Sequence, residues 1–138
     1  MNQRRVFLRK MAASAAAAAL LPLAGSAATG QVALTGTLVH HVFFWLKEPG
    51  DPRVREKFEA ALTKLLEVKT IRLSHLGKPA PTEKRTVVDH SWDYSLLLFF
   101  NSGEEQQSYQ VDPLHLAFVE ENSHLWEKVV VYDTVDLS

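Results

Sequence analysis

The stretch LVHHVFFWLK at residues 38–47 decides the fold, because it is rich in β-branched and aromatic residues and is apolar on both of its faces. Successive side chains of a strand point to opposite sides of the sheet. One face would carry His40, Val42, Phe44 and Leu46, and the other face Val39, His41, Phe43 and Trp45. The pair Pro49-Gly50 then ends the strand. The pattern predicts a strand that is buried on both sides.

Two further segments are also apolar on both faces. Residues 92–100 (WDYSLLLFF) and 128–133 (KVVVYD) are each expected to form a strand, and a shorter strand is expected over residues 70–76. Helices on one side of such a sheet leave its other side open to water. Burial of apolar surface contributes ~25 cal/mol of stabilising free energy per Å2, and an exposed sheet face would lose it. We therefore expect a second copy of the chain to cover this face. The alternative is that loops of the same chain, chiefly residues 77–91, cover this face.

A helix is expected after the first strand. Asp51 suits the N-cap position, with Pro52 as the first helical residue. Apolar residues then recur at helical spacing, which predicts an amphipathic helix over residues 52–68.

The second half of the chain carries another helical region. Ser102 and Glu105 have the spacing of a capping box, which predicts a helix through Tyr109. Pro113 interrupts this helix, and another is expected over about 114–126. The element order is then βαββαβ, the ferredoxin-like α+β plan with one four-stranded antiparallel sheet.

Residues 1–28 have the three-part plan of a signal peptide: a basic start, an apolar run over residues 11–23 and small residues before a cleavage expected near residues 26–28. Residues 4–9 (RRVFLR) resemble the twin-arginine motif, which addresses folded passengers to the Tat translocon. The apolar run is shorter than the roughly 20 residues of a membrane span. We expect a periplasmic protein without stable membrane insertion, with a linker at residues 29–37. A general secretory leader, or a buried helix of the mature fold, is the alternative.

Composition narrows the function further. The 138 residues contain no cysteine, which excludes disulfides, thiolate metal sites and cysteine nucleophiles. Without the first 28 residues, 11 basic and 16 acidic residues would remain, a net charge of −5. An acidic domain of this kind disfavours nucleic acid as a partner, because phosphate backbones are bound by clustered Lys and Arg.

Three separated segments resemble one known family. They are residues 40–47 (HHVFFWLK), 108–118 (SYQVDPLHLAF) and 124–133 (HLWEKVVVYD). In this order they resemble the stress-responsive A/B-barrel (Dabb) domain, over residues 38–135. The resemblance implies a ferredoxin-like subunit and a homodimer whose two sheets close into one α+β barrel. Most members have no established activity, and one branch contains cofactor-free plant enzymes that close a polyketide ring by aldol chemistry.

The resemblance also implies the candidate site. The pattern Tyr-x-x-x-Pro-x-His places the catalytic pair of that branch on Tyr109 and His115. A histidine that faces the barrel cavity falls on His40, and Val42 and Phe44 follow it on the same face as ligand contacts. Asp112 is a further candidate ligand contact, and it stands where the plant enzymes have a histidine.

The chemistry of these residues fits more than one role. A histidine can take a proton alpha to a carbonyl while a phenol donates to the developing enolate. A buried hydrogen bond between Tyr109 and His115 that holds the helix break would need no substrate. His40 could equally be a core histidine. Asp112 and His115 could form a metal pair, but no third ligand has suitable spacing, so no metal is expected.

Residues 89–93 gather Asp89, His90 and Asp93, for which turn and capping roles are expected rather than catalysis. Three functions follow from the sequence. The first is a dimeric barrel that binds a small, mostly apolar or aromatic ligand. The second is a cofactor-independent lyase or cyclase acting on a carbonyl or polyketide-like substrate. The third is a structural protein with a filled barrel.

Overall fold

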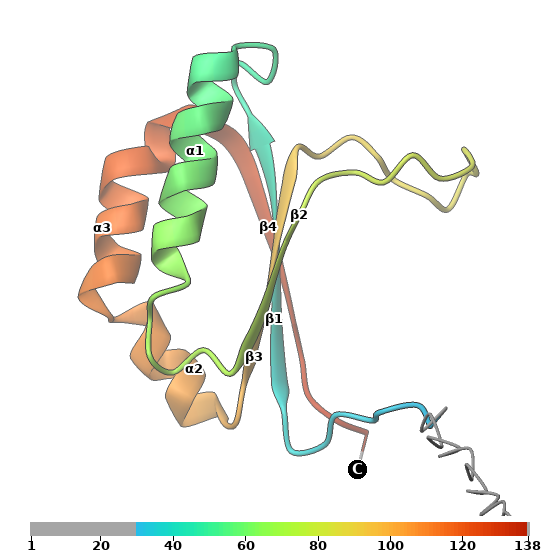
Figure 1. Cartoon of the computed structure of the whole chain (residues 1–138), viewed down its shortest axis with the longest axis vertical. Helices are drawn as coiled ribbons and strands as arrows, with labels where there is room; N and C mark the ends of the chain where they lie inside the picture. The colour runs from blue at the N-terminus through green and yellow to red at the C-terminus, as the bar shows by residue number, and fades with distance from the viewer. Residues whose placement is uncertain (1–29, 138) are drawn as a thin grey trace, which may run out of the picture. The chain divides into compact units, whose positions relative to one another are not determined.

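In the computed structural model, which describes residues 30–137, a four-stranded antiparallel sheet carries all of the described helices on one face (Figure 1). The strands are β1 (Leu38–Leu46), β2 (Leu73–Gly77), β3 (Tyr94–Phe100) and β4 (Trp126–Thr134). The helices are α1 (Pro52–Leu65), α2 (Gly103–Gln110) and α3 (Pro113–Asn122), and a 3-10 turn, Ser123–Leu125, joins α3 to β4. The strand order is β2-β3-β1-β4, which confirms the ferredoxin-like α+β plan.

The core lies between the sheet and the helices. Alternate residues of β1 and β3 point into it, and their aliphatic and aromatic side chains are almost fully buried: Val42, Phe44, Leu46, Leu96, Leu98 and Phe100. Phe58 of α1 is 0% exposed and packs against Phe44 with their ring centroids 5.1 Å apart. The face of β1 that carries His40 is therefore the face that the helices cover.

The helix α1 begins where the sequence predicts and ends three residues earlier than expected. The Asp51 side chain accepts a hydrogen bond from the Arg53 backbone N–H at 2.8 Å, which confirms the N-cap. After Leu65 the chain turns, because the Val68 N–H donates to the Leu65 carbonyl and the Ile71 N–H to the Val68 carbonyl. These turns occupy the residues that were expected to start the second strand.

The helical region after β3 also differs from the expectation at its end. Glu105 N–H donates to the Ser102 hydroxyl at 3.1 Å, as a capping box requires, and α3 starts at Pro113. The expected helix to Trp126 is too long, because α3 ends at Asn122 and Trp126 is already in β4, opposite Leu46 of β1. Pairing with the central strand overrides the helical pattern there.

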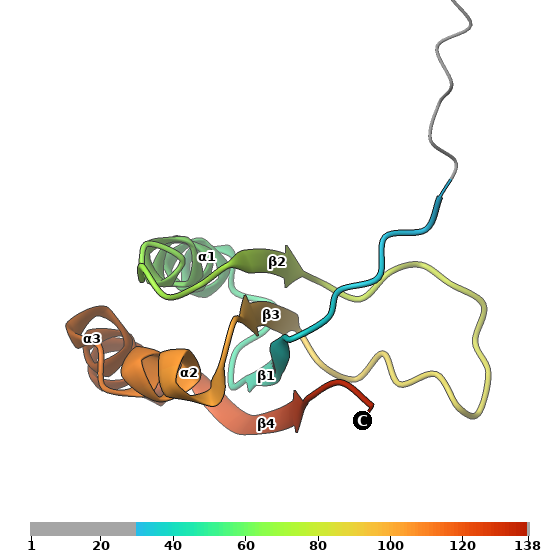
Figure 2. The same cartoon turned by 90° about the horizontal axis from the view of Figure 1, so that it is seen from below.

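The sheet face away from the helices is open and partly apolar. It presents Val39, Phe43 and Trp45 of β1 together with Leu97 and Phe99 of β3, all of intermediate exposure. The connection between β2 and β3 leaves the sheet on this side and projects away from it (Figures 1 and 2). It touches one end only: Trp92 packs on Phe43 at a ring-centroid distance of 5.1 Å, and Trp45 Nε1 donates to Ser91 Oγ. The alternative that loops cover this face therefore holds for one end of it.

The expected leader lies outside the described residues, and residues 30–37 form no helix or strand. Within residues 30–137 no helix combines the length and the hydropathy that a membrane span requires.

Replacement of Phe58 by alanine tests the location of the core. We expect the free energy of unfolding to fall by about 3–5 kcal/mol, because the substitution leaves a cavity at a fully buried position. Val87, which is 82% exposed in the β2–β3 connection, is the control, and Val87→Ala should change stability by less than about 0.5 kcal/mol. Urea unfolding followed by circular dichroism measures both, and equal losses would contradict this packing.

Candidate functional site

A cavity of about 230 Å3 lies between the sheet and the helices α2 and α3. Its walls are mostly apolar and include Val42 and Phe44 of β1, Phe118 of α3, and Val129 and Val131 of β4. The two β4 valines are 43% and 44% exposed, so the cavity opens to solvent beside this edge strand. The lining also includes side chains with polar groups, namely His40, Tyr109, Gln110, His115 and Trp126.

Tyr109 and His115 meet because the chain breaks between them. Tyr109 lies in the last turn of α2, and Pro113 begins α3 after a break at Val111 and Asp112. The break turns α3 so that the rings of Tyr109 and His115 lie 4.7 Å apart between centroids. The two side chains of the expected pair therefore lie side by side across the proline.

His115 holds the helix break through a backbone contact. Its Nδ1 lies 3.0 Å from the Gln110 carbonyl oxygen. Because a carbonyl only accepts hydrogen bonds, Nδ1 carries the proton, and Nε2 of the neutral ring remains an acceptor. Burial lowers the pKa of His115 from its ordinary value of 6.5, and the nearby His40 lowers it further, against opposing contributions from the Gln110 carbonyl and Asp112. A neutral imidazole with an available Nε2 can serve as a base.

Tyr109 is 1% exposed, and burial raises the pKa of its phenol well above the usual range. The phenol is therefore protonated near neutral pH and can donate a hydrogen bond. Within residues 30–137 its hydroxyl forms no hydrogen bond with the protein. The hydroxyl oxygen keeps a small solvent-accessible area. The suggested Tyr109–His115 hydrogen bond is thus not formed, and the hydroxyl is available to a molecule in the cavity.

His40 is oriented by an acidic residue of the neighbouring strand. Its Nδ1 lies 2.6 Å from Asp133 Oδ1, and the two residues are opposite each other in the β1–β4 pairing. A carboxylate accepts the hydrogen bond from Nδ1–H, so Nε2 of His40 is the ring nitrogen that Asp133 does not bind. The His40 ring meets Tyr109 edge-to-face at 5.7 Å, which places it next to the Tyr109–His115 pair.

The structure brings five of the six predicted site residues to one cavity and separates the sixth. His40, Val42, Phe44, Tyr109 and His115 all line it. Asp112 does not: its carboxylate caps α3 by accepting the Leu114 N–H at 2.8 Å. Asp112 thus serves as the N-cap that the broken helix needs, and a ligand contact at this residue stays a prediction.

The position of the cavity also corrects an expectation. His40 was expected to face a cavity enclosed by two sheets, but it faces the helices of its own chain. The cavity thus lies within one chain. Sequence reasoning missed Asp133 and the β4 valines, because only the register between the first and last strands shows that these residues reach the site.

The other acidic and histidine candidates have structural roles. Asp93 accepts the Leu46 N–H at 2.8 Å and pairs with Arg55 at 3.1 Å. Asp89 accepts the Ser91 N–H, and His90 contacts the Thr82 hydroxyl at 3.0 Å. In the described part of the chain no three His, Asp or Glu side chains gather as a metal site would require.

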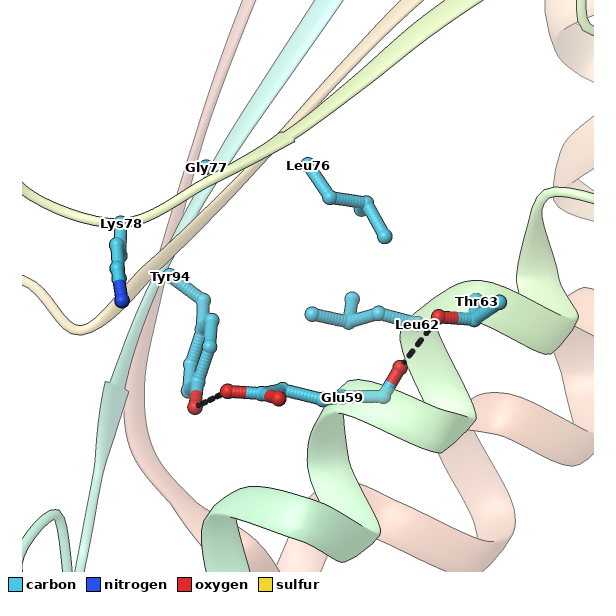
Figure 3. A pocket seen from close by; sticks show the side chains of 7 residues that line it. All are labelled: Glu59, Leu62, Thr63, Leu76, Gly77, Lys78 and Tyr94. Atoms are coloured by element: carbon cyan, nitrogen blue, oxygen red, sulfur yellow. Dashed lines mark hydrogen bonds between the residues drawn. The ribbon is translucent and has the colours of Figure 1, made fainter.

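A second cavity, of about 310 Å3, lies between α1 and the ends of β2 and β3 (Figure 3). Several of its polar groups, those of Tyr94, Glu59 and Thr63, already have protein partners. Tyr94 donates to Glu59 Oε1 at 2.6 Å and accepts from Arg55 at 3.1 Å, and Thr63 donates to the Glu59 carbonyl. The first cavity, in which the Tyr109 hydroxyl is available, is the better candidate site.

Proton titration of His115 tests this local geometry. Nuclear magnetic resonance should give a midpoint below 6.5 in the folded protein, and the ordinary value in urea. Because the folded pKa is the lower one, His115 should reduce stability as the pH falls below the ordinary value towards the folded one. Equal midpoints in the folded and unfolded chain would contradict the burial of this ring.

Comparison with known proteins finds the same fold in several solved structures. Structures with the same fold include a Dabb family protein from Mesorhizobium loti, with 20% identity and a TM-score of 0.63 over 74% of this chain and 98% of that one. A hydroxynitrile lyase from Passiflora edulis has 17% identity and a TM-score of 0.62 over 73% of this chain and 94% of that one. A dimeric ferredoxin-like protein of unknown function from Thermobifida fusca has 16% identity and a TM-score of 0.59, covering 72% and 90%.

No curated protein matches the sequence. Residues 38–136 match the family described as the stress responsive A/B barrel domain. This match spans all four strands and all of the described helices. The chain therefore belongs to the stress-responsive A/B-barrel (Dabb) domain family.

Proposed function

We propose that this chain forms a homodimer through its open sheet face and binds a small, mostly apolar ligand in the cavity beside Tyr109. The proposal includes export to the periplasm through the leader of twin-arginine type at residues 1–28. N-terminal sequencing of protein recovered from the periplasm tests the export, and an intact leader there would contradict it.

The dimer is supported by the open face of the sheet. Aromatic and aliphatic side chains of β1 and β3 lie there without helices above them, and burial under a second sheet would remove that surface from water. An interface around a two-fold axis uses the same patch on both subunits, so it needs no second kind of partner. Structures from Thermobifida fusca and Bacteroides fragilis with this fold are described as dimeric.

The unpaired Tyr109 hydroxyl is the observation that carries the ligand proposal. The hydroxyl donates to no protein group and keeps a small accessible area, so an acceptor on a ligand could replace water as its partner. The Nε2 atoms of His40 and His115 lie on rings that contact Tyr109, so acceptors are available beside the donor. The remaining walls are mostly apolar.

This distribution defines the ligand class. The cavity volume of about 230 Å3 suits a small aliphatic or aromatic molecule. A carbonyl oxygen on that molecule would accept from Tyr109, and a hydroxyl on it could donate to one of the two histidines. The open side beside β4 allows a larger molecule to extend into solvent.

Narrowing the cavity at β4 tests ligand binding. Acetophenone, an aromatic ketone, serves as the probe in ligand-observed magnetic resonance. Val131→Phe should abolish the saturation transfer seen with the wild type, because Val131 lines the cavity. Val135→Phe is the matched control, since Val135 is 71% exposed beyond the end of β4 and does not line it. Equal saturation transfer from both variants to acetophenone would show that the probe binds outside this cavity. No saturation transfer from the wild type would contradict the proposed ligand class.

A second candidate function, a cofactor-independent lyase or cyclase, rests on the paired chemistry of Tyr109 and His115. A neutral imidazole with an available Nε2 can take the hydroxyl proton of a hydroxynitrile as the bond to the nitrile carbon breaks, and the cyanide then leaves with that proton as HCN. The protonated phenol can donate a hydrogen bond to the carbonyl oxygen that forms. The Passiflora edulis protein of this fold is described as a hydroxynitrile lyase. A hydroxynitrile is a small molecule with one hydroxyl, which is the size and polarity that this cavity suits.

Release of cyanide from an aromatic hydroxynitrile tests this candidate. Tyr109→Phe and His115→Ala should each lower the rate by about 100-fold or more, which is the usual contribution of a general acid or base. Circular dichroism must show that both variants remain folded. Conversion at equal rates by the wild type and both variants, or no conversion by the wild type, would remove the lyase and leave the binding proposal standing.

A further inference from the structure

The open sheet face carries two histidines in an otherwise mostly apolar surface. His41 of β1 and His75 of β2 are both opposite Leu97 of β3, one from each side, so the three residues form a row across the sheet. The His41 ring lies 4.2 Å from the Phe43 ring between centroids. His41 is partly buried and His75 is exposed. The row lies on the face that a second subunit would cover.

The charges around this row do not neutralise it. Among the residues paired through the four strands, none on the open face is acidic; Lys128 and Tyr132 of β4 are its other ionisable groups. The Lys128 ammonium lies over the Trp45 ring at 4.3 Å and is near the Asp89 carboxylate of the β2–β3 connection. His40 lies next to His41 on the opposite face, where Asp133 binds it. The carboxylates of Asp89 and Asp133 thus lie beside Lys128 and His40 rather than beside His41 and His75.

We propose that protonation of His41 and His75 separates the two subunits, so that the dimer is stable near neutral pH and dissociates in mild acid. This inference rests on the dimer of the proposed function. In an interface around a two-fold axis, each histidine row is present twice, so full protonation adds four positive charges to a largely apolar contact. Burying a charge without a partner is costly, whereas the neutral rings pack as ordinary aromatic groups.

The pKa of His41 is already lowered in a single chain, as acid dissociation of the dimer requires. Burial lowers the pKa of His41 below 6.5, and His75 and His40 lower it further. A second sheet over this face would increase the burial. Because dissociation then raises the pKa, free subunits bind more protons than the dimer, and acid shifts the equilibrium towards them.

Sedimentation equilibrium of the purified protein across a pH series tests the inference. The dissociation constant should rise by about tenfold or more from about pH 7.5 to about pH 5.5, since each proton bound on dissociation adds up to about tenfold per pH unit. His41→Gln and His75→Gln should each reduce this rise, and the double variant should remain a dimer at the lower pH. His124→Gln, at an exposed position in the 3-10 turn, is the control and should behave as the wild type.

The outcomes separate this inference from the proposed function. A dimer whose dissociation constant does not change with pH would overturn the role of the histidines alone. The same conclusion follows if the double variant dissociates in acid as the wild type does while circular dichroism shows both folded. A monomer at both pH values would overturn the dimer itself, and with it the inference.

Discussion

The central strand β1 has to bury both of its faces, and the rest of the structure depends on this constraint. Its pairing with β3 and β4 satisfies the backbone, which leaves two apolar rows of side chains to cover. The helices cover the row of Val42, Phe44 and Leu46. Phe43 and Trp45 lie on the open face and remain partly exposed. The two faces thus acquire different tasks, one for the core and cavity and one for association.

The cavity arises from incomplete coverage on the helical side. Two short helices stand where one long helix could have sealed the sheet, because Pro113 cannot continue α2. The gap beside β4 remains open, and the break brings Tyr109 and His115 together at its inner end. Asp112 then serves the new helix as its cap and does not line the cavity. A single helix break therefore creates both the cavity and its polar end.

Binding and catalysis would use the same arrangement here. An available phenol and two histidine Nε2 atoms beside a mostly apolar cavity would hold a carbonyl compound in place in the proposed function, and they could also move its protons. His40 differs from His115 in how it is held: a carboxylate orients the first and a backbone carbonyl the second. Each partner fixes its ring through Nδ1, so the two imidazoles are held by contacts of different chemical kind.

The sequence by itself determined the α+β plan, the strands apolar on both faces and the N-cap at Asp51, because these depend on local periodicity and capping. The pair Tyr109–His115 was expected from the resemblance of its segment to a known family. Helix and strand ends were less predictable: pairing with β1 drew Trp126 into β4. Only the tertiary structure decided that Asp133 orients His40, that Asp112 is a cap and that the cavity lies on the helical side. The physical reason is that strand register and helix packing bring together residues that are far apart in the sequence. A local sequence pattern does not show which distant residues will be neighbours.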